Sequence, residues 1–173
     1  MPYNPNIHHR RSIRLKGYDY SQAGLYFITI CCENREHRFG KIENGEMILN
    51  EYGQIAFDEW LKTTKIRNNV ELGAFIVMPN HMHGIIVLNH VVGAGFTPAP
   101  TKPATIGDIA GAYKSLVTNA CIGICNSQNI RLGKLWQRNY HEHIIRDEQS
   151  YQRISEYIIN NPAKWAEDKF FTK

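Results

Sequence analysis

The chain has 173 residues, 43% of them hydrophobic, so it is long enough for one domain with its own core and too apolar to be disordered over most of its length. Its 20 Lys and Arg residues exceed its 16 Asp and Glu residues, and the resulting charge of +4 permits a nucleic-acid partner without requiring one. No signal peptide is apparent, and no apolar run approaches the roughly 20 residues of a membrane helix. We therefore expect a cytoplasmic protein with no membrane partner.

The first half of the chain predicts a strand, a hairpin and a helix. Residues 24–32, GLYFITICC, are rich in aromatic and β-branched residues, which favours a buried strand. The dipeptide Asn44-Gly45 predicts a tight turn between two short strands. Asn50 can cap a helix that continues to about Lys65, because apolar residues recur there at helical spacing.

The next segments predict two more strands, 71–78 and 83–88, which pair antiparallel because only Pro79-Asn80 separates their ends. Thr105 can cap a helix. The segment 135–146, LWQRNYHEHIIR, alternates well enough for a strand. Asp147 then begins a last helix, which Pro162 would stop. This order predicts an α+β domain, a mainly antiparallel sheet with helices packed on it.

Three further features concern the organisation of this domain, which we expect to span residues 1–173. Residues 1–20 form a basic N-terminal arm, in which Arg10, Arg11 and Arg14 are candidate phosphate contacts or simply part of a solvated terminus. Residues 91–104, VVGAGFTPAPTKPA, predict a mobile Gly/Pro-rich loop within the domain. The four cysteines, Cys31, Cys32, Cys121 and Cys125, lack zinc-site spacing and are expected to be reduced core residues.

Two histidines stand at the mouth of a predicted strand in the segment MPNHMHGIIVL, residues 78–88. Alternate side chains of a strand share a face, so His81 and His83 lie side by side and Met82 points to the other face. Two neighbouring imidazoles can bind one metal ion. They can also be polar residues on a solvated sheet face that contribute little to the core, and the local pattern leaves both readings open.

The last predicted helix offers a third ligand and a nucleophile. Tyr157 and Asn161 are four residues apart and project from one helical face. If this face lies over the histidines, the neutral nitrogen and oxygen ligands suit Mg²⁺ or Mn²⁺ better than a structural zinc. A divalent ion can orient a phosphate for in-line attack, and the phenol can form a covalent intermediate. The plainer alternative makes Tyr157 a core aromatic residue and Asn161 a helix C-cap.

The segments VMPNHMHGIIVL, LWQRNYHEHIIR and YIINNP, together with GLYFITI and IGDIAGAYKSL, resemble the single-tyrosine HUH transposases, and within them the REP-associated tyrosine transposase branch. The resemblance covers about Gly24 to Trp165 and implies a ferredoxin-like antiparallel sheet with helices packed on it. It implies that His81, His83 and Asn161 bind the metal and that Tyr157 is the nucleophile.

The activity implied by this resemblance is metal-dependent cleavage and rejoining of single-stranded, hairpin-bearing DNA. The tyrosine would attack a phosphate, which leaves a 5′-phosphotyrosine and a free 3′-hydroxyl. Insertion-sequence relatives are typically dimers that exchange the tyrosine helix, whereas the REP-associated branch can act as a monomer. The sequence leaves monomer and homodimer open.

Other residues are weaker candidates. Tyr140 is the rival nucleophile, on the strand face opposite His141 and His143. Four residues are candidates for DNA contact: Trp136 and Arg138 through stacking on unpaired bases, and Lys114 and Arg146 through phosphates. Trp136 could equally be a core residue.

Two other functions compete with strand transfer. The first is a non-catalytic DNA- or RNA-hairpin-binding regulatory relative, against which the complete set of Tyr157, Asn161 and both histidines argues. The second is a small metallohydrolase, against which the lack of a further Asp, Glu or His cluster near the pair argues.

Overall fold

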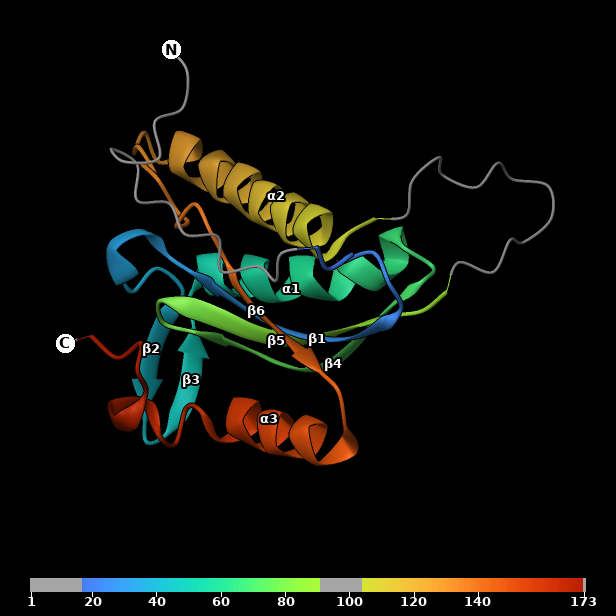
Figure 1. Cartoon of the computed structure of the whole chain (residues 1–173). Coiled ribbons are helices and arrows are strands. Elements are labelled where there is room, and N and C mark those ends of the chain that lie inside the picture. Colours follow the sequence, from blue (N-terminus) through green and yellow to red (C-terminus); the bar gives the residue numbers. More distant parts are fainter. Residues whose placement is uncertain (1–16, 91–103, 173) are drawn as a thin grey trace, which may run out of the picture.

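The computed structural model describes residues 17–90 and 104–172, and the elements follow one another as the sequence predicts (Figure 1). In chain order they are β1 (Gly24–Cys31), the 3-10 turn η1 (Glu33–Arg35), β2 (Gly40–Glu43), β3 (Glu46–Leu49), α1 (Glu51–Ile66), β4 (Val70–Met78), β5 (His81–Leu88), α2 (Ile106–Ser127), β6 (His141–Ile145), α3 (Glu148–Asn160) and the 3-10 turn η2 (Trp165–Glu167). Within the described part of the chain, none of the helices combines the length and the apolar composition needed to cross a bilayer.

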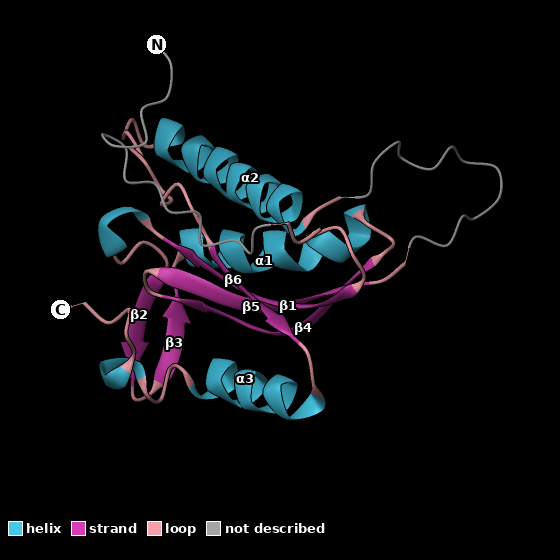
Figure 2. Ribbon diagram, viewed as in Figure 1, coloured by secondary structure: helices cyan, strands magenta, loops and turns pink. Residues whose placement is uncertain are grey.

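The main sheet has four strands in the order β4-β5-β1-β6, and each neighbouring pair is antiparallel (Figure 2). The connections β1-α1-β4-β5-α2-β6 give the ferredoxin-like arrangement, to which the β2–β3 hairpin and α3 are added. The predicted fold class is therefore confirmed.

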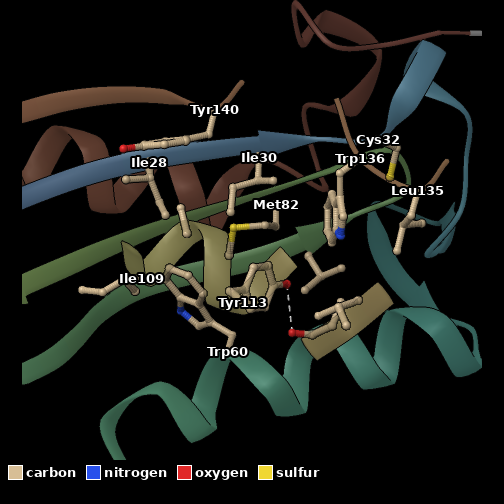
Figure 3. Packing of buried hydrophobic residues seen from close by; sticks show 14 of the residues in the cluster. Ile28, Ile30, Cys32, Trp60, Met82, Ile109, Tyr113, Leu135, Trp136 and Tyr140 are labelled. Carbon is tan, nitrogen blue, oxygen red and sulfur yellow. Dashed lines mark hydrogen bonds between the residues drawn. The ribbon is translucent and has the colours of Figure 1, made fainter. Parts of the chain in front are cut away.

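The two faces of the sheet are covered by different helices, with α1 and α2 on one side and α3 on the other (Figure 1). On the α1/α2 side, Trp60 and Tyr113 are buried in a large cluster with Met82 (Figure 3). The Tyr113 hydroxyl donates a hydrogen bond to the Ala56 carbonyl at 3.0 Å, which joins α2 to α1. On the other side α3 is anchored by a much smaller buried cluster, Ile85, Ile145 and Ile158.

Local signals account for the ends of the helices. Asn50 accepts from the Gly53 amide at 2.9 Å, and Thr105 and Asp108 form a reciprocal capping box. Asp147 accepts from the Ser150 amide at the start of α3. Each of these predicted caps is confirmed.

The strand predicted over 135–146 is wrong in extent, because only His141–Ile145 pairs along β1. Trp136 makes an isolated bridge to Cys32, and the Gln137 amide donates to the Cys31 carbonyl at 2.9 Å. The segment before β6 is therefore tied to the end of β1 by single contacts rather than by a continuous ladder. Arg10, Arg11, Arg14 and residues 91–103 of the predicted loop lie outside the described residues.

Candidate active site

The paired histidines lie at the start of β5, on the face of the sheet that α3 covers. Both side chains are fully buried, at 0% exposure, while Met82 between them points into the α1/α2 core. The alternative of a solvated sheet face that contributes little to the core is therefore wrong. The cover comes from the end of the chain, since the Phe170 ring lies 4.7 Å from the His81 ring and 5.6 Å from the His83 ring between centroids.

Hydrogen bonds fix how the histidine rings are oriented. The Asn80 amide nitrogen donates to the carbonyls of Phe170 at 2.9 Å and Arg35 at 3.2 Å. Its oxygen therefore faces His81 Nδ1, at 2.8 Å, and accepts a hydrogen bond from the Nδ1–H group. His81 Nε2 is then left with a lone pair. His83 Nδ1 is paired with the Thr29 hydroxyl at 2.8 Å, an outer partner of the kind that orients metal-binding histidines.

Burial keeps both imidazoles neutral. It lowers the pKa of His81 to about 4, and it lowers the pKa of His83 well below the usual value, with the nearby His81 acting in the same direction. The two Nε2 atoms lie 3.0 Å apart. Two ligands about 2.1 Å from one ion and at right angles to each other would be separated by about 3.0 Å, so the pair fits one octahedral divalent cation.

Helix α3 brings the predicted nucleophile to this pair. Ile158 is buried against the sheet, and Tyr157 beside it is 39% exposed, which excludes the reading of a core aromatic residue. The Tyr157 hydroxyl lies 3.1 Å from His83 Nε2. Asn161, at the C-cap of α3, is 2% exposed, and its carbonyl oxygen Oδ1 is buried without a hydrogen-bond partner.

The structure adds Asp168, which the sequence reasoning missed. Its Oδ2 accepts from the Tyr157 hydroxyl at 2.8 Å and from Asn161 Nδ2 at 2.6 Å, and its Oδ1 accepts from the Phe170 amide at 2.6 Å. A carboxylate oxygen of Asp168 lies within 4.8 Å of ligand atoms of His81 and His83. Asp168 thus joins the two histidines in one group of possible metal ligands, which the sequence did not predict. No spacing rule connects Asp168 to α3, because the chain turns back after Pro162.

The charges around the phenol oppose its spontaneous ionisation. Burial, the hydrogen bond to Asp168 and the negative charge of that residue together raise the pKa of Tyr157. Burial would raise the pKa of Asp168, but the hydrogen bonds from Phe170, Asn161 and Tyr157 outweigh it, and the net shift is downward. At neutral pH the site therefore contains a carboxylate that accepts a hydrogen bond from a protonated phenol.

The donor set fits a hard divalent ion. The Nε2 atoms of His81 and His83 and the unpaired Asn161 Oδ1 would be neutral ligands. A buried carbonyl oxygen without a partner is costly unless something occupies its lone pairs. Asp168 adds a nearby negative charge. Mixed nitrogen and oxygen donors of this kind suit hard ions such as Mn²⁺ or Mg²⁺, whereas thiolate ligands would select softer metals.

A surface cleft of about 370 Å³ opens beside Tyr157. Its lining includes Tyr157, Asn161, Asn160, Arg153 and Lys164. The exposed edge of the Tyr157 ring is therefore reachable from solvent, although the histidines behind it are not.

The remaining predicted residues lie elsewhere. Tyr140 is 8% exposed in the α1/α2 core, on the sheet face opposite the histidines (Figure 3). Trp136 is a core residue as well, and its indole nitrogen donates to the Lys114 carbonyl at 3.1 Å, so its base-stacking role is corrected. The Lys114 ammonium donates to the carbonyls of Gln137 at 2.7 Å and Arg138 at 3.0 Å, which occupies it within the fold. The side chains of Arg138 and Arg146 are exposed.

Several known proteins are similar to this chain in sequence or in fold. No protein-family model matches the chain. It is 44% identical over 179 residues to an uncharacterised protein of Haemophilus influenzae, with 98% of this chain and 97% of that protein covered. It is 26% identical over 148 residues to the REP-associated tyrosine transposase of Escherichia coli, with 84% and 70% covered. A solved structure of a REP-associated tyrosine transposase bound to a REP hairpin superimposes with a TM-score of 0.60, at 23% identity, over 91% of this chain and 77% of that one.

The fold is an α+β domain like that of the solved transposase, and it brings His81, His83 and Tyr157 together on one face of the sheet. In sequence the chain is similar to REP-associated tyrosine transposases, at 26% identity to those of Haemophilus influenzae and Escherichia coli, and its fold is like that of the solved REP-associated tyrosine transposase.

Proposed function

We propose that the protein is a metal-dependent endonuclease and strand transferase that cleaves and rejoins single-stranded, hairpin-bearing DNA through a 5′-phosphotyrosine. The observation that carries this proposal is the position of the Tyr157 hydroxyl, 3.1 Å from His83 Nε2 and 2.8 Å from Asp168 Oδ2. A nucleophile, a proton acceptor and a set of cation ligands thus meet beside an open cleft.

The residues have separate parts in the proposed reaction. His81, His83 and Asn161 would bind Mn²⁺ or Mg²⁺, which when bound withdraws charge from a phosphate and orients it. Tyr157 Oη forms a bond to phosphorus, and its proton passes to the Asp168 carboxylate, to which it is already hydrogen-bonded. The bond from phosphorus to the 3′ oxygen breaks, and that oxygen takes up a proton and leaves as a 3′-hydroxyl. Attack by a 3′-hydroxyl on the phosphotyrosine reverses these steps and rejoins a strand.

The substrate class rests on the relatives, one of which was solved with a REP hairpin bound. A hairpin with a single-stranded flank offers a folded element for recognition and a flexible phosphate for the cleft beside Tyr157. Arg153 and Lys164 line the same cleft and would contact phosphates there, beside the acidic residues Glu156, Glu167 and Asp168.

One observation favours the alternative of a non-catalytic hairpin-binding protein. His81 and His83 are fully buried, so the metal ligands do not contact solvent in this conformation. A binding protein would tolerate such closure, whereas a nuclease requires the phosphate to reach the metal.

A covalent-adduct assay separates the two. Hairpin DNA with a labelled single-stranded flank is incubated with the full chain and Mn²⁺ or Mg²⁺, and the product is run on a denaturing gel. We expect a labelled protein band that maps to Tyr157, and Tyr157→Phe should bind the hairpin but form no band. Tyr151→Phe is the matched control, because Tyr151 lies on the same helix but packs in the Ile85 cluster. Hairpin binding without any adduct would support the non-catalytic alternative.

A further inference from the structure

The side-chain amide of Asn161 has two unequal ends in this structure. Its Nδ2 donates to Asp168 Oδ2 at 2.6 Å, and its Oδ1 is buried with no hydrogen-bond partner. A carboxylate can only accept, so the opposite orientation would set the amide oxygen against Asp168 Oδ2 and leave Nδ2 without its acceptor. Asp168 therefore selects the orientation in which the Asn161 oxygen is unpaired.

Asp168 is itself held in place by its own segment. The Phe170 amide donates to Oδ1 at 2.6 Å, and the Phe170 ring is 4% exposed against the histidine rings. Oδ2 accepts two hydrogen bonds, from Tyr157 and Asn161, which occupy its two lone-pair directions. This saturation argues that Asp168 acts on the metal site through its neighbours rather than as a ligand.

We propose that Asp168 is a positioning residue that turns the Asn161 carbonyl oxygen toward His81 and His83 and so completes the cation site. The inference rests on the proposed metal-dependent function and assigns to it a residue outside the HUH, tyrosine and asparagine positions. Metal affinity would then depend on a carboxylate in the segment that follows α3.

The substitution Asp168→Asn tests this with little change in shape. One of its two terminal atoms becomes an NH₂ group. If that group faces Phe170, it meets a backbone donor that cannot turn away. If it faces Asn161, the Asn161 amide must flip so that its oxygen accepts this new hydrogen bond and is no longer unpaired. In both cases the orientation that leaves Asn161 Oδ1 free for a cation loses its support.

Isothermal titration of the full chain with Mn²⁺, without DNA, measures the effect. We expect Asp168→Asn to weaken Mn²⁺ binding by about 10- to 100-fold, the usual loss when an outer partner of a metal ligand is removed. Glu167→Gln is the matched control, since it removes the same charge from the exposed neighbouring residue and should leave the affinity unchanged. Thermal melts in EDTA establish that each variant is folded.

A double-mutant cycle with Asn161→Ala distinguishes positioning from direct ligation. If Asp168 acts through Asn161, the double variant should bind Mn²⁺ as weakly as Asn161→Ala alone. Additive losses would overturn the inference, because they would make Asp168 an independent ligand, and so would unchanged affinity in Asp168→Asn. A wild-type chain that binds no Mn²⁺ would instead overturn the proposed metal site, and the inference with it.

Discussion

The strand residue next to His83 packs closely against a buried tryptophan, and adding a single methyl group there tests this packing. Gly84 follows His83 on β5 and faces the α1/α2 side, where a Cβ atom would lie 2.5 Å from Trp60 Cζ2 and 3.0 Å from Cε2. Trp60 is fully buried, with Tyr113 edge-on at 5.2 Å and Phe75 at 6.3 Å between ring centroids. We therefore expect Gly84→Ala to destabilise the protein.

The magnitude follows from the distance. Carbon atoms in contact prefer about 3.5–4.0 Å, so the indole must move by about 1 Å into neighbours that are already packed. Overpacking of this kind costs about 1–3 kcal/mol. The lower backbone freedom of Ala in the unfolded chain offsets about 0.5–1 kcal/mol of this. The net loss is about 1–2 kcal/mol, or a fall of about 2–8 °C in Tm for a chain of this size.

Thermal and urea unfolding of three single variants and one double variant test this reasoning. Gly111→Ala is the matched control, because no atom lies within 4 Å of its added Cβ and Ala is favoured over Gly inside a helix by about 1 kcal/mol, so its Tm should rise. Trp60→Phe removes the clashing atom without breaking a hydrogen bond, since Trp60 Nε1 has no partner. Combined with Gly84→Ala, it should cost less than the sum of the two single changes. Unaltered stability in Gly84→Ala, or simple additivity, would refute the clash.

Three further outcomes are expected. His81→Ala should lower the free energy of unfolding by about 2–3 kcal/mol in metal-free urea titrations, because it empties a fully buried position and leaves the Asn80 oxygen without its donor; an unchanged midpoint would contradict this. Lys114→Met should lower the Tm by the equivalent of about 1 kcal/mol, since it removes two hydrogen bonds to backbone carbonyls, yet leave the salt dependence of hairpin binding as in wild type; a slope reduced by about 1 would restore its role as a phosphate contact. Binding of hairpin DNA should weaken with salt and exceed that of plain duplex in fluorescence titrations, and equal affinities at moderate salt would count against a preference for single strands.

Short-range signals predicted most of the scaffold. The Asn44-Gly45 turn, the Asn50 and Thr105 caps and the Pro79-Asn80 junction each act within a few residues, and each appears where the sequence places it. The alternation of side chains along β5 likewise placed His81 and His83 together and Met82 on the other face.

Features that depend on how the segment after α3 folds back onto the sheet could not be predicted. The burial of the histidines comes from Phe170, and the carboxylate beside Tyr157 comes from Asp168, both in a segment with no periodic pattern. The predicted strand over 135–146 is too long at its start because Trp136 follows the alternation of a strand but is buried by packing against α2 and the end of β1. Sequence spacing describes one element at a time, and these contacts join elements that are far apart in the chain.

The small size of the cluster beneath α3 affects how firmly the last part of the chain is attached. Only Ser155 and Ile158 of this helix are buried, and Ile159 is 66% exposed, so few apolar contacts oppose its local detachment. A cation shared between β5 and Asn161 would bridge the sheet and the end of this helix. Binding energy would then appear as local stability, and amide hydrogen exchange should slow in α3 more than in α1 or α2 when Mn²⁺ is added. Binding of a cation at the site and ordering of α3 with the segment after it would then be one coupled equilibrium.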